Sequence, residues 1–240
     1  MNKMRQKSIS AFFPAHNESQ NLPALIADVE DILAKNFLEY EIIIINDGST
    51  DDSASVLENL RQSYPHLHVI THPTNLGYGT AVKSGFLAAK NDLIFFSDAD
   101  RQFDLKELKL LLDKLGRYDA VVGYRRQRSD NLIRIMSAWG WNKLIWLVFG
   151  INYKDIDCAF KLFTRTILNK IDVGQLISRG AMISAEILIK IKDVNGRVLE
   201  VPVSHLSRKF GRATGGNIKV ISRAFKELYK LWRVMRGRKI

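Results

Sequence analysis

The sequence predicts an α/β fold in which a mostly parallel central sheet is flanked by helices. Short apolar runs of strand length alternate with amphipathic segments of helical length through the first hundred residues. This alternation is typical of βαβ units, whose helices cover the faces of a parallel sheet. Residues 41–45 read EIIII, and an unbroken apolar run is expected for a strand buried on both faces. The 240 residues fit one large domain, or one domain with an appendage.

The first hundred residues predict four strands, at 8–13, 41–45, 68–71 and 93–96. Helices are expected between them. Apolar residues are spaced for one helical face in segment 22–33 and again in segment 82–87. Residues 46–52 read NDGSTDD, which predicts a turn and a helix start that Ser49 or Thr50 can cap.

Fewer elements are predicted in the rest of the chain. Strands are expected at 121–125 and 198–205, and helices at 136–149 and 217–238. No internal repeat is found. No run reaches the ~18 apolar residues of a membrane span.

The stretch from 93 to 103, LIFFSDADRQF, indicates a metal site. Two carboxylates, Asp98 and Asp100, directly follow a buried strand, where ligands of open α/β sheets bind. Mg²⁺ or Mn²⁺ prefers oxygen ligands, usually one or two carboxylates plus phosphate oxygens, and Gln102 can add an amide oxygen. An isolated Asp-x-Asp is more often a solvated turn at a helix start. The buried strand before it favours the metal site.

The charge of the chain is unevenly distributed. Of the net +11, the part from Val203 onward carries +10, because it holds eleven basic residues and one acid. Such asymmetry points to an anionic partner, either nucleic acid or a membrane surface. The single cysteine, Cys158, excludes an internal disulfide and fits a reducing compartment.

Four motifs follow successive predicted strands in a fixed order. PAHNE, NDGSTDDS, NLGYGTA and DADRQF together resemble the family-2 inverting glycosyltransferases, which have the nucleotide-binding GT-A fold. Three later segments, VVGYR, LIRIMS and DIDCAFKLF, are similar to those of polyprenyl-phosphate sugar transferases such as dolichyl-phosphate mannose synthase and its bacterial relatives. The resemblance covers roughly residues 8–216. It implies a catalytic domain at 1–216, followed by a basic amphipathic helix at 217–240.

The resemblance implies a donor site with a catalytic carboxylate pair, Asp98 and Asp100. In this family, the base and ribose are held by residues at the positions of Pro14, His16, Glu18 and Asp47. The diphosphate is bordered by residues at the positions of Asp98, Ala99 and Asp100. Arg208 and Arg212 match the basic positions of a loop that folds over the diphosphate. Asp100 and Gln102 would be the ligands of Mg²⁺ or Mn²⁺. A bound cation would neutralise charge on the departing nucleoside diphosphate.

The acceptor is expected to be a phosphate. Arg125 and Arg134 can bind one and Ser137 can donate to it, because arginine recognises phosphate with two parallel hydrogen bonds. For each arginine alone, a solvated surface charge is the commoner explanation. Arg125 ends an apolar strand, which places it at the binding edge of the sheet.

Two apolar helices leave alternatives open. The helix at 136–149 holds Trp139, Trp141 and Trp146, which fit either core burial or a membrane-facing surface. The apolar stripe of the helix at 217–238 fits packing on the body. Its cations instead fit binding to anionic lipid.

These observations predict a metal-dependent inverting hexosyltransferase. It would move a sugar from a UDP- or GDP-sugar to a polyprenyl or dolichyl phosphate, as a peripheral protein on the cytoplasmic face of a membrane. A hydroxyl acceptor is the alternative, and it would need Asp155 or Asp157 as a general base. A nucleic-acid-binding protein is a third interpretation. The ordered acidic loops of the first hundred residues argue against nucleic acid as a partner.

Overall fold

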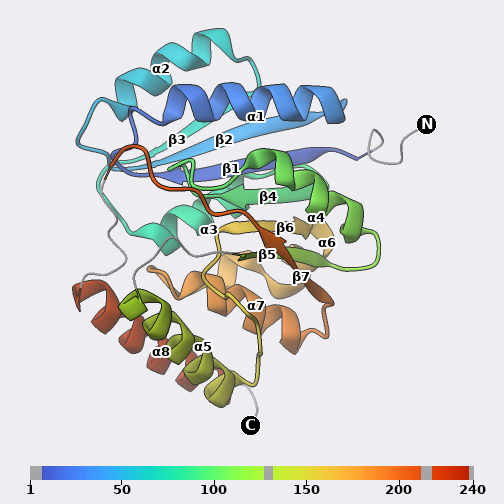
Figure 1. Cartoon of the computed structure of the whole chain (residues 1–240), viewed down its shortest axis with the longest axis vertical. Coiled ribbons are helices and arrows are strands. Elements are labelled where there is room, and N and C mark those ends of the chain that lie inside the picture. Colours follow the sequence, from blue (N-terminus) through green and yellow to red (C-terminus); the bar gives the residue numbers. More distant parts are fainter. Residues whose placement is uncertain (1–6, 127–131, 212–217, 238–240) are drawn as a thin grey trace.

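The computed structural model describes residues 7–126, 132–211 and 218–237, with side chains in 7–126, 139–211 and 222–237. Its centre is a seven-stranded sheet of order β3-β2-β1-β4-β6-β5-β7 (Figure 1). The strands are β1 (Ile9–Ala15), β2 (Tyr40–Asp47), β3 (Leu67–His72), β4 (Leu93–Ser97), β5 (Ala120–Arg125), β6 (Phe160–Thr164) and β7 (Val198–Val203). The predicted α/β class with a mostly parallel sheet is confirmed.

Helices follow most of the strands. They are α1 (Leu22–Asn36), α2 (Ser53–Ser63), α3 (Tyr78–Ala88), α4 (Leu108–Leu115), α5 (Leu132–Phe149), α6 (Arg165–Ile171), α7 (Ile183–Asp193) and α8 (Ile218–Gly237). Short 3₁₀ turns lie at Leu105–Glu107 and Val173–Gln175. None of the helices that the structure describes has the length and apolar character needed to cross a bilayer.

Strand β6 was absent from the sequence-based expectation. It lies antiparallel between β4 and β5, whereas the β1–β2, β2–β3, β1–β4 and β5–β7 pairs are parallel. Its five residues, FKLFT, form only a short apolar run, and Lys161 interrupts that run. Because β6 runs backwards, the residues before Phe160 lie at the edge where the parallel strands β1, β2, β4 and β5 end.

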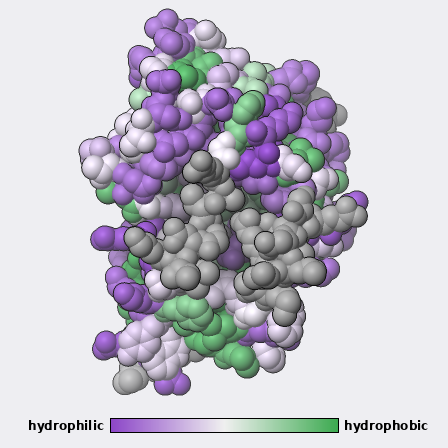
Figure 2. All heavy atoms as spheres, turned by 60° about the vertical axis from the view of Figure 1, so that its left-hand side comes forward, coloured by the Kyte–Doolittle hydropathy of each residue, from purple (hydrophilic) through white to green (hydrophobic). Residues whose placement is uncertain are grey.

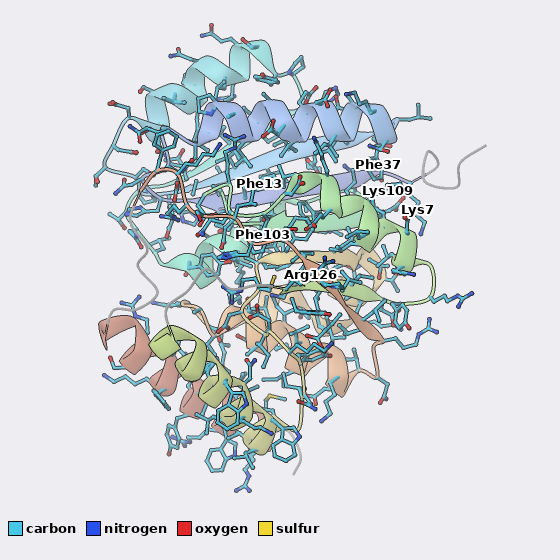
Figure 3. The ribbon with its side chains drawn as sticks, viewed as in Figure 1. Lys7, Phe13, Phe37, Phe103, Lys109 and Arg126 are labelled. Carbon is cyan, nitrogen blue, oxygen red and sulfur yellow. The ribbon has the colours of Figure 1, made fainter. Side chains whose placement is uncertain are left out.

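Aromatic rings fill both faces of the sheet. On one face Phe12 stacks on Phe96 at a centroid distance of 5.4 Å, and Phe86 of α3 meets Phe12 edge-on at 4.9 Å. On the other face Phe95 packs against Phe13 and Phe160, under α1 and α4 (Figure 1; Phe13 is labelled in Figure 3). This packing makes the sheet a rigid support for the loops at its carboxyl edge.

A second, smaller core lies where α5, α7 and α8 meet. Leu188 and Ile189 of α7, Ile145 of α5 and Leu231 of α8 are all fully buried there. Helices α5 and α8 lie side by side below the sheet (Figure 1), and the rings of Trp141 and Phe225 meet edge-on at 5.6 Å. The basic helix therefore packs on the body through one edge.

The expected cap of α2 was wrong. The helix begins at Ser53, whose backbone N–H donates to Asp51 Oδ1 at 3.0 Å. Ser49 lies earlier, and its hydroxyl accepts the N–H of Asn17 at 3.0 Å. Ser49 therefore joins two loops rather than starting a helix.

Candidate active site

Two loops at the carboxyl edge of β1 and β2 are bound tightly to each other. Asn17 has a left-handed backbone with φ of 59°, and its side-chain oxygen accepts the N–H of Thr50 at 2.7 Å. The Ser53 hydroxyl accepts the N–H of Glu18 at 3.1 Å. Gly48 also has a positive φ, of 62°, and a Cβ there would lie 2.2 Å from the backbone of Thr74. These contacts fix the first two predicted motifs in one wall.

Asp47 holds a third loop in place. Its carboxylate accepts the N–H groups of Leu76 and Gly77, both at 2.9 Å, and is 2.7 Å from His72 Nδ1. His16 Nδ1 lies 2.8 Å from the Asp47 carbonyl oxygen. The carboxylate is buried and is used within the chain, so its contact with a donor base stays a prediction.

The loop held by Asp47 brings Tyr78 to the predicted carboxylate pair. The Tyr78 hydroxyl donates to Asp98 Oδ1 at 2.9 Å. Burial, followed by the charge of Asp100, raises the pKa of Asp98 from 3.8 to about 7. Burial and the nearby Asp98 carboxylate also raise the pKa of Tyr78 well above 10. Sequence reasoning did not single out Tyr78, although it lies inside the NLGYGTA motif.

Arg208 connects the second carboxylate to the first motif. Its guanidinium lies 2.8 Å from Asp100 Oδ2 and 3.2 Å from Glu18 Oε1. Burial raises the pKa of Glu18 and outweighs the hydrogen bond from Asn21, which lowers it. The structure thus brings together Glu18, Asp100 and Arg208, three residues predicted for the donor site that lie far apart in the sequence. Pro14 and Ala99 lie at the same edge, on β1 and between the two carboxylates.

The residues present suit a divalent cation. Asp98 and Asp100 crowd negative charge into a half-buried site, and a cation would relieve that repulsion. Gln102 donates its backbone N–H to Asp100 Oδ1 at 3.1 Å, while its side-chain nitrogen donates to the Leu206 carbonyl at 3.0 Å. Within the described ranges no three His, Cys, Asp or Glu residues cluster as a metal site. A cation would therefore need additional oxygens, such as those of a diphosphate.

Comparison with known proteins decides the family. Residues 10–172 match the family model described as Glycosyl transferase family 2, which is more than half of the chain. The chain belongs to glycosyltransferase family 2. The resemblance seen in the motifs is confirmed, and the predicted donor residues lie in the wall of loops described above.

Two curated relatives of this glycosyltransferase are about equally similar to it. Dolichyl-phosphate β-glucosyltransferase ALG5A of Trichomonas vaginalis is 31% identical over 211 residues, covering 81% of this chain and 64% of the relative. Undecaprenyl-phosphate 4-deoxy-4-formamido-L-arabinose transferase of Klebsiella pneumoniae is 30% identical over 219 residues, covering 90% of this chain and 65% of the relative. The chain therefore spans just under two thirds of the length of each relative.

Solved structures share the fold at low identity. Glucosyl-3-phosphoglycerate synthase from Mycobacterium tuberculosis, in complex with Mn²⁺, UDP-glucose and phosphoglyceric acid, aligns with a TM-score of 0.72 and 17% identity. The alignment covers 94% of this chain and 80% of that one. This confirms the predicted GT-A type of fold for the glycosyltransferase.

Arg125 lies at the predicted edge, but its guanidinium is engaged within the chain. Its Nε and Nη2 atoms donate to the two carboxylate oxygens of Asp155 at 2.6 and 2.8 Å; the Asp155 side chain is buried and that of Arg125 is 14% exposed. Although burial opposes its charge, the hydrogen bonds to Asp155 raise the pKa of Arg125 above its ordinary value. The ion pair fixes the end of β5 to the segment before β6.

The other predicted acceptor residues are only partly located. Arg134 and Ser137 lie in α5, with side chains outside the described residues. Arg212, which was predicted for the donor site, also lies outside the described residues. Their roles stay predictions.

A buried lysine behind the carboxylates was missed. Lys161 of β6 is fully buried, donates to the carbonyls of Ile156 and Cys158, and lies 5.5 Å from the centre of the Phe96 ring. Burial lowers the pKa of Lys161, and its positive charge offsets part of the rise in the pKa of Asp98 that burial and Asp100 cause. The position of Lys161 between apolar residues in AFKLF was the sequence signal that could have indicated a buried lysine.

Proposed function

We propose that this glycosyltransferase is metal-dependent and transfers a sugar, with inversion, from a UDP- or GDP-sugar to a polyprenyl phosphate at a membrane surface. The observation that carries the proposal is the carboxylate pair of Asp98 and Asp100, with Arg208 beside it at the carboxyl edge of the sheet. The printed names of both curated relatives support a polyprenyl-phosphate acceptor. The fold neighbour solved with Mn²⁺ and UDP-glucose supports the donor class and the metal.

The donor half of the site would bind a nucleoside diphosphate. Asp98 and Asp100, with Gln102, would hold Mg²⁺ or Mn²⁺, which supplies positive charge to a diphosphate leaving group. Arg208 comes from the segment after β7 and already reaches Asp100, so it is placed to share its guanidinium with diphosphate oxygens. Tyr78 orients Asp98 by donating to it.

The acceptor half favours a phosphate over a hydroxyl. A phosphate is an anion near neutral pH and needs no strong general base, whereas a hydroxyl must lose a proton. Asp155, one of the two base candidates, accepts both side-chain hydrogen bonds of Arg125 and is buried. An ion-paired carboxylate is a weak base, so this pairing argues against Asp155 in that role. A small-molecule acceptor is the second candidate, because the fold neighbour was crystallised with phosphoglyceric acid.

The paired helices α5 and α8 supply a surface suited to a membrane. Trp139, Trp146 and Leu147 of α5 are 66, 44 and 72% exposed, and Phe225 and Tyr229 of α8 are 50 and 58% exposed. Figure 2 shows hydrophobic atoms gathered at the lower end of the molecule, where Figure 1 places these helices. Lys143 lies over the Trp146 ring at 5.1 Å, and Arg236 over the Trp232 ring at 4.5 Å. Tryptophan beside cations suits the headgroup region of anionic lipid.

A donor and acceptor panel tests the proposal. The full chain is incubated with UDP- or GDP-sugars, Mn²⁺ or Mg²⁺, and either a polyprenyl phosphate in anionic vesicles or phosphoglyceric acid, and products are identified by mass. We expect a sugar-phosphate lipid that chelator prevents from forming, and a loss of at least about a hundredfold in Asp100→Ala. Lys114→Ala, on the exposed surface of α4, is the matched control. Product formed only on phosphoglyceric acid would favour the second candidate, and unchanged turnover of Asp100→Ala with chelator would refute the metal.

A further inference from the structure

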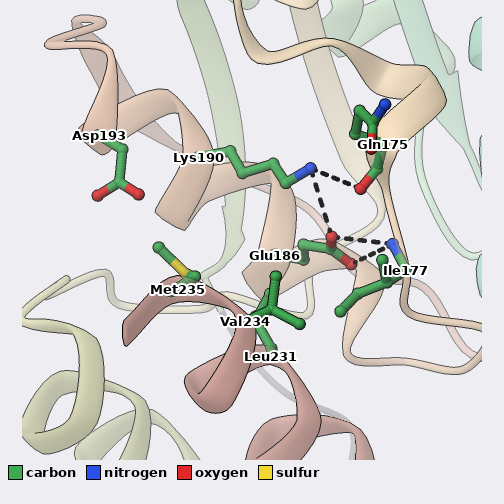
Figure 4. Close-up of a pocket in the computed structure, with 8 residues that line it drawn as sticks. All are labelled: Gln175, Ile177, Glu186, Lys190, Asp193, Leu231, Val234 and Met235. Carbon is green, nitrogen blue, oxygen red and sulfur yellow. Dashed lines mark hydrogen bonds and ion pairs between the residues drawn. The ribbon is translucent and has the colours of Figure 1, made fainter. Parts of the chain in front are cut away.

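Four successive backbone N–H groups, from Ile177 to Gly180, donate to just two carboxylates. Glu186 of α7 accepts that of Ile177 at 2.9 Å (Figure 4) and that of Ser178 at 2.8 Å. Glu227 of α8 accepts those of Arg179 at 3.1 Å and Gly180 at 3.2 Å. Segment 177–180 is therefore held between the two helices.

The same segment packs directly on the loop that carries Tyr78. The N–H of Gly79 donates to the Arg179 carbonyl at 2.8 Å. A Cβ at Gly79 would lie 2.6 Å from the Ser178 carbonyl oxygen, and one at Gly77 would lie 2.7 Å from the Arg179 carbonyl oxygen. The two backbones touch without side chains between them, so a shift of one segment must move the other.

The far side of that loop is the predicted donor site. Asp47 holds the N–H groups of Leu76 and Gly77, and the Tyr78 hydroxyl donates to Asp98. A continuous series of contacts thus runs from Glu227, through segment 177–180 and Gly79, to the carboxylate pair.

Glu227 is the one acid from Val203 onward, in a helix whose other charges are positive. Its carboxylate accepts backbone N–H groups of the body, while Lys226 and Lys230 beside it are exposed. Farther along α8, a cavity of about 390 Å³ separates it from α7, lined by Val234 and Met235 among others (Figure 4). Because packing between α7 and α8 is incomplete there, the hydrogen bonds of Glu227 help to fix the position of α8.

We propose that Glu227 is a positioning residue for the transfer reaction. It holds segment 177–180 against Gly77 and Gly79, keeps Tyr78 on Asp98, and couples the position of the basic helix α8 to the donor site. The effect on catalysis rests on the donor site proposed above. Coupling is reciprocal, so a ligand at the carboxylates should also strengthen the contacts of Glu227.

The experiment compares Glu227→Ala and Glu227→Gln with Lys226→Ala, an exposed neighbour on the same helix, in the full chain. Hydrogen exchange measures the amides of Gly79, Arg179 and Gly180, and calorimetry measures the affinity for UDP with Mn²⁺. We expect Glu227→Ala to exchange at least about tenfold faster at Gly79 and to bind UDP about fivefold more weakly. Glu227→Gln, which keeps an accepting oxygen, should fall between Glu227→Ala and wild type, and Lys226→Ala should match wild type.

A double-mutant cycle separates positioning from general loosening. In a Tyr78→Phe background, the further loss of UDP affinity on Glu227→Ala should shrink to less than about twofold, because both changes remove the same contact path. A full fivefold loss in that background, or wild-type exchange at Gly79 in Glu227→Ala, would overturn the inference.

Two other outcomes are also decided. If Glu227→Ala does not fold, the exchange rate at Gly79 in Glu227→Gln tests the inference instead. A wild-type rate in that variant counts against the inference. If wild type binds neither UDP nor GDP in the presence of Mn²⁺, the proposed function fails, while the exchange measurements still test the coupling.

Discussion

At the residue scale, the environment of Asp98 opposes the charge of its carboxylate. Its pKa of about 7 in the folded chain lies above the ordinary 3.8, because it is buried beside Asp100. A raised folded-state pKa contributes stability that is complete below about pH 4 and is lost as the pH rises through 7.

Replacing that carboxyl should therefore stabilise the metal-free chain at high pH. We expect Asp98→Asn to be more stable than wild type at pH 8 by on the order of 1–3 kcal/mol, with the difference vanishing near pH 4. Urea unfolding in chelator at several pH values measures it, with exposed Asp31→Asn as the control. A difference that does not change with pH would show that Asp98 is ionised normally.

Arg125 leads to a second prediction at this scale. Arg125→Ala removes two charge-assisted hydrogen bonds from the buried Asp155 carboxylate, so we expect the free energy of unfolding to fall by about 3–5 kcal/mol. The double change Arg125→Met with Asp155→Leu should recover much of that loss in urea unfolding. A loss below about 1 kcal/mol, together with weaker use of the acceptor, would instead restore Arg125 as a direct phosphate ligand.

The motifs predicted which candidate donor residues would lie close together better than they predicted the ion pairs that these residues form. Strand ends placed Glu18, Asp47 and Asp100 at one edge, because parallel strands finish on the same side. Ion pairs such as Arg208 with Asp100 and Arg125 with Asp155 join distant positions and follow from the fold rather than from any local pattern. From the sequence, Arg125 was interpreted as a phosphate-binding residue or a solvated surface charge, and not as the partner of Asp155.

At the element scale, β6 shows where pattern reasoning fails. A five-residue strand with a buried lysine lacks the length and alternation that signal a strand, although its register with β4 spans Leu93–Ser97 completely. Helices α1 and α8 were predicted because their apolar periodicity is sustained over several turns. Periodicity could not say that α8 would use Leu231 for packing and leave Phe225 half exposed.

The exposed charges of α8 predict binding to anionic vesicles. Reversing Lys230, Arg233 and Arg236 to Glu should weaken co-sedimentation at least about tenfold, since each cation near such a surface contributes on the order of 1 kcal/mol. Lys114, Arg117 and Lys170, which are exposed elsewhere, give a control with the same net charge when reversed. Equal binding by both triple variants would show that total charge, not this helix, attracts the lipid.

At the scale of the whole molecule, ligand binding should be visible as stability. A ligand that binds only the folded chain at a hundred times its Kd adds about 2.7 kcal/mol, or roughly 5–10 °C in Tm for a chain of this size. We expect that shift from UDP with Mn²⁺, with little from UDP plus chelator. A shift of the same size with chelator would show that the nucleotide binds without the metal.

The position of β6 has a consequence for how the chain is made. Four parallel strands, β3-β2-β1-β4, are complete by Ser97, whereas β6, which covers the open side of β4, begins only at Phe160. During synthesis that unpaired side faces the surroundings for about sixty residues, which at 5–20 residues per second is several seconds. A bare strand edge is a template for pairing with another chain. Nascent or truncated chains that stop between β4 and β6 should therefore need chaperones most. Strand β6 ends that exposure, and because it is the only strand in the described sheet that pairs with both β4 and β5, it joins the two halves of the sheet in one step.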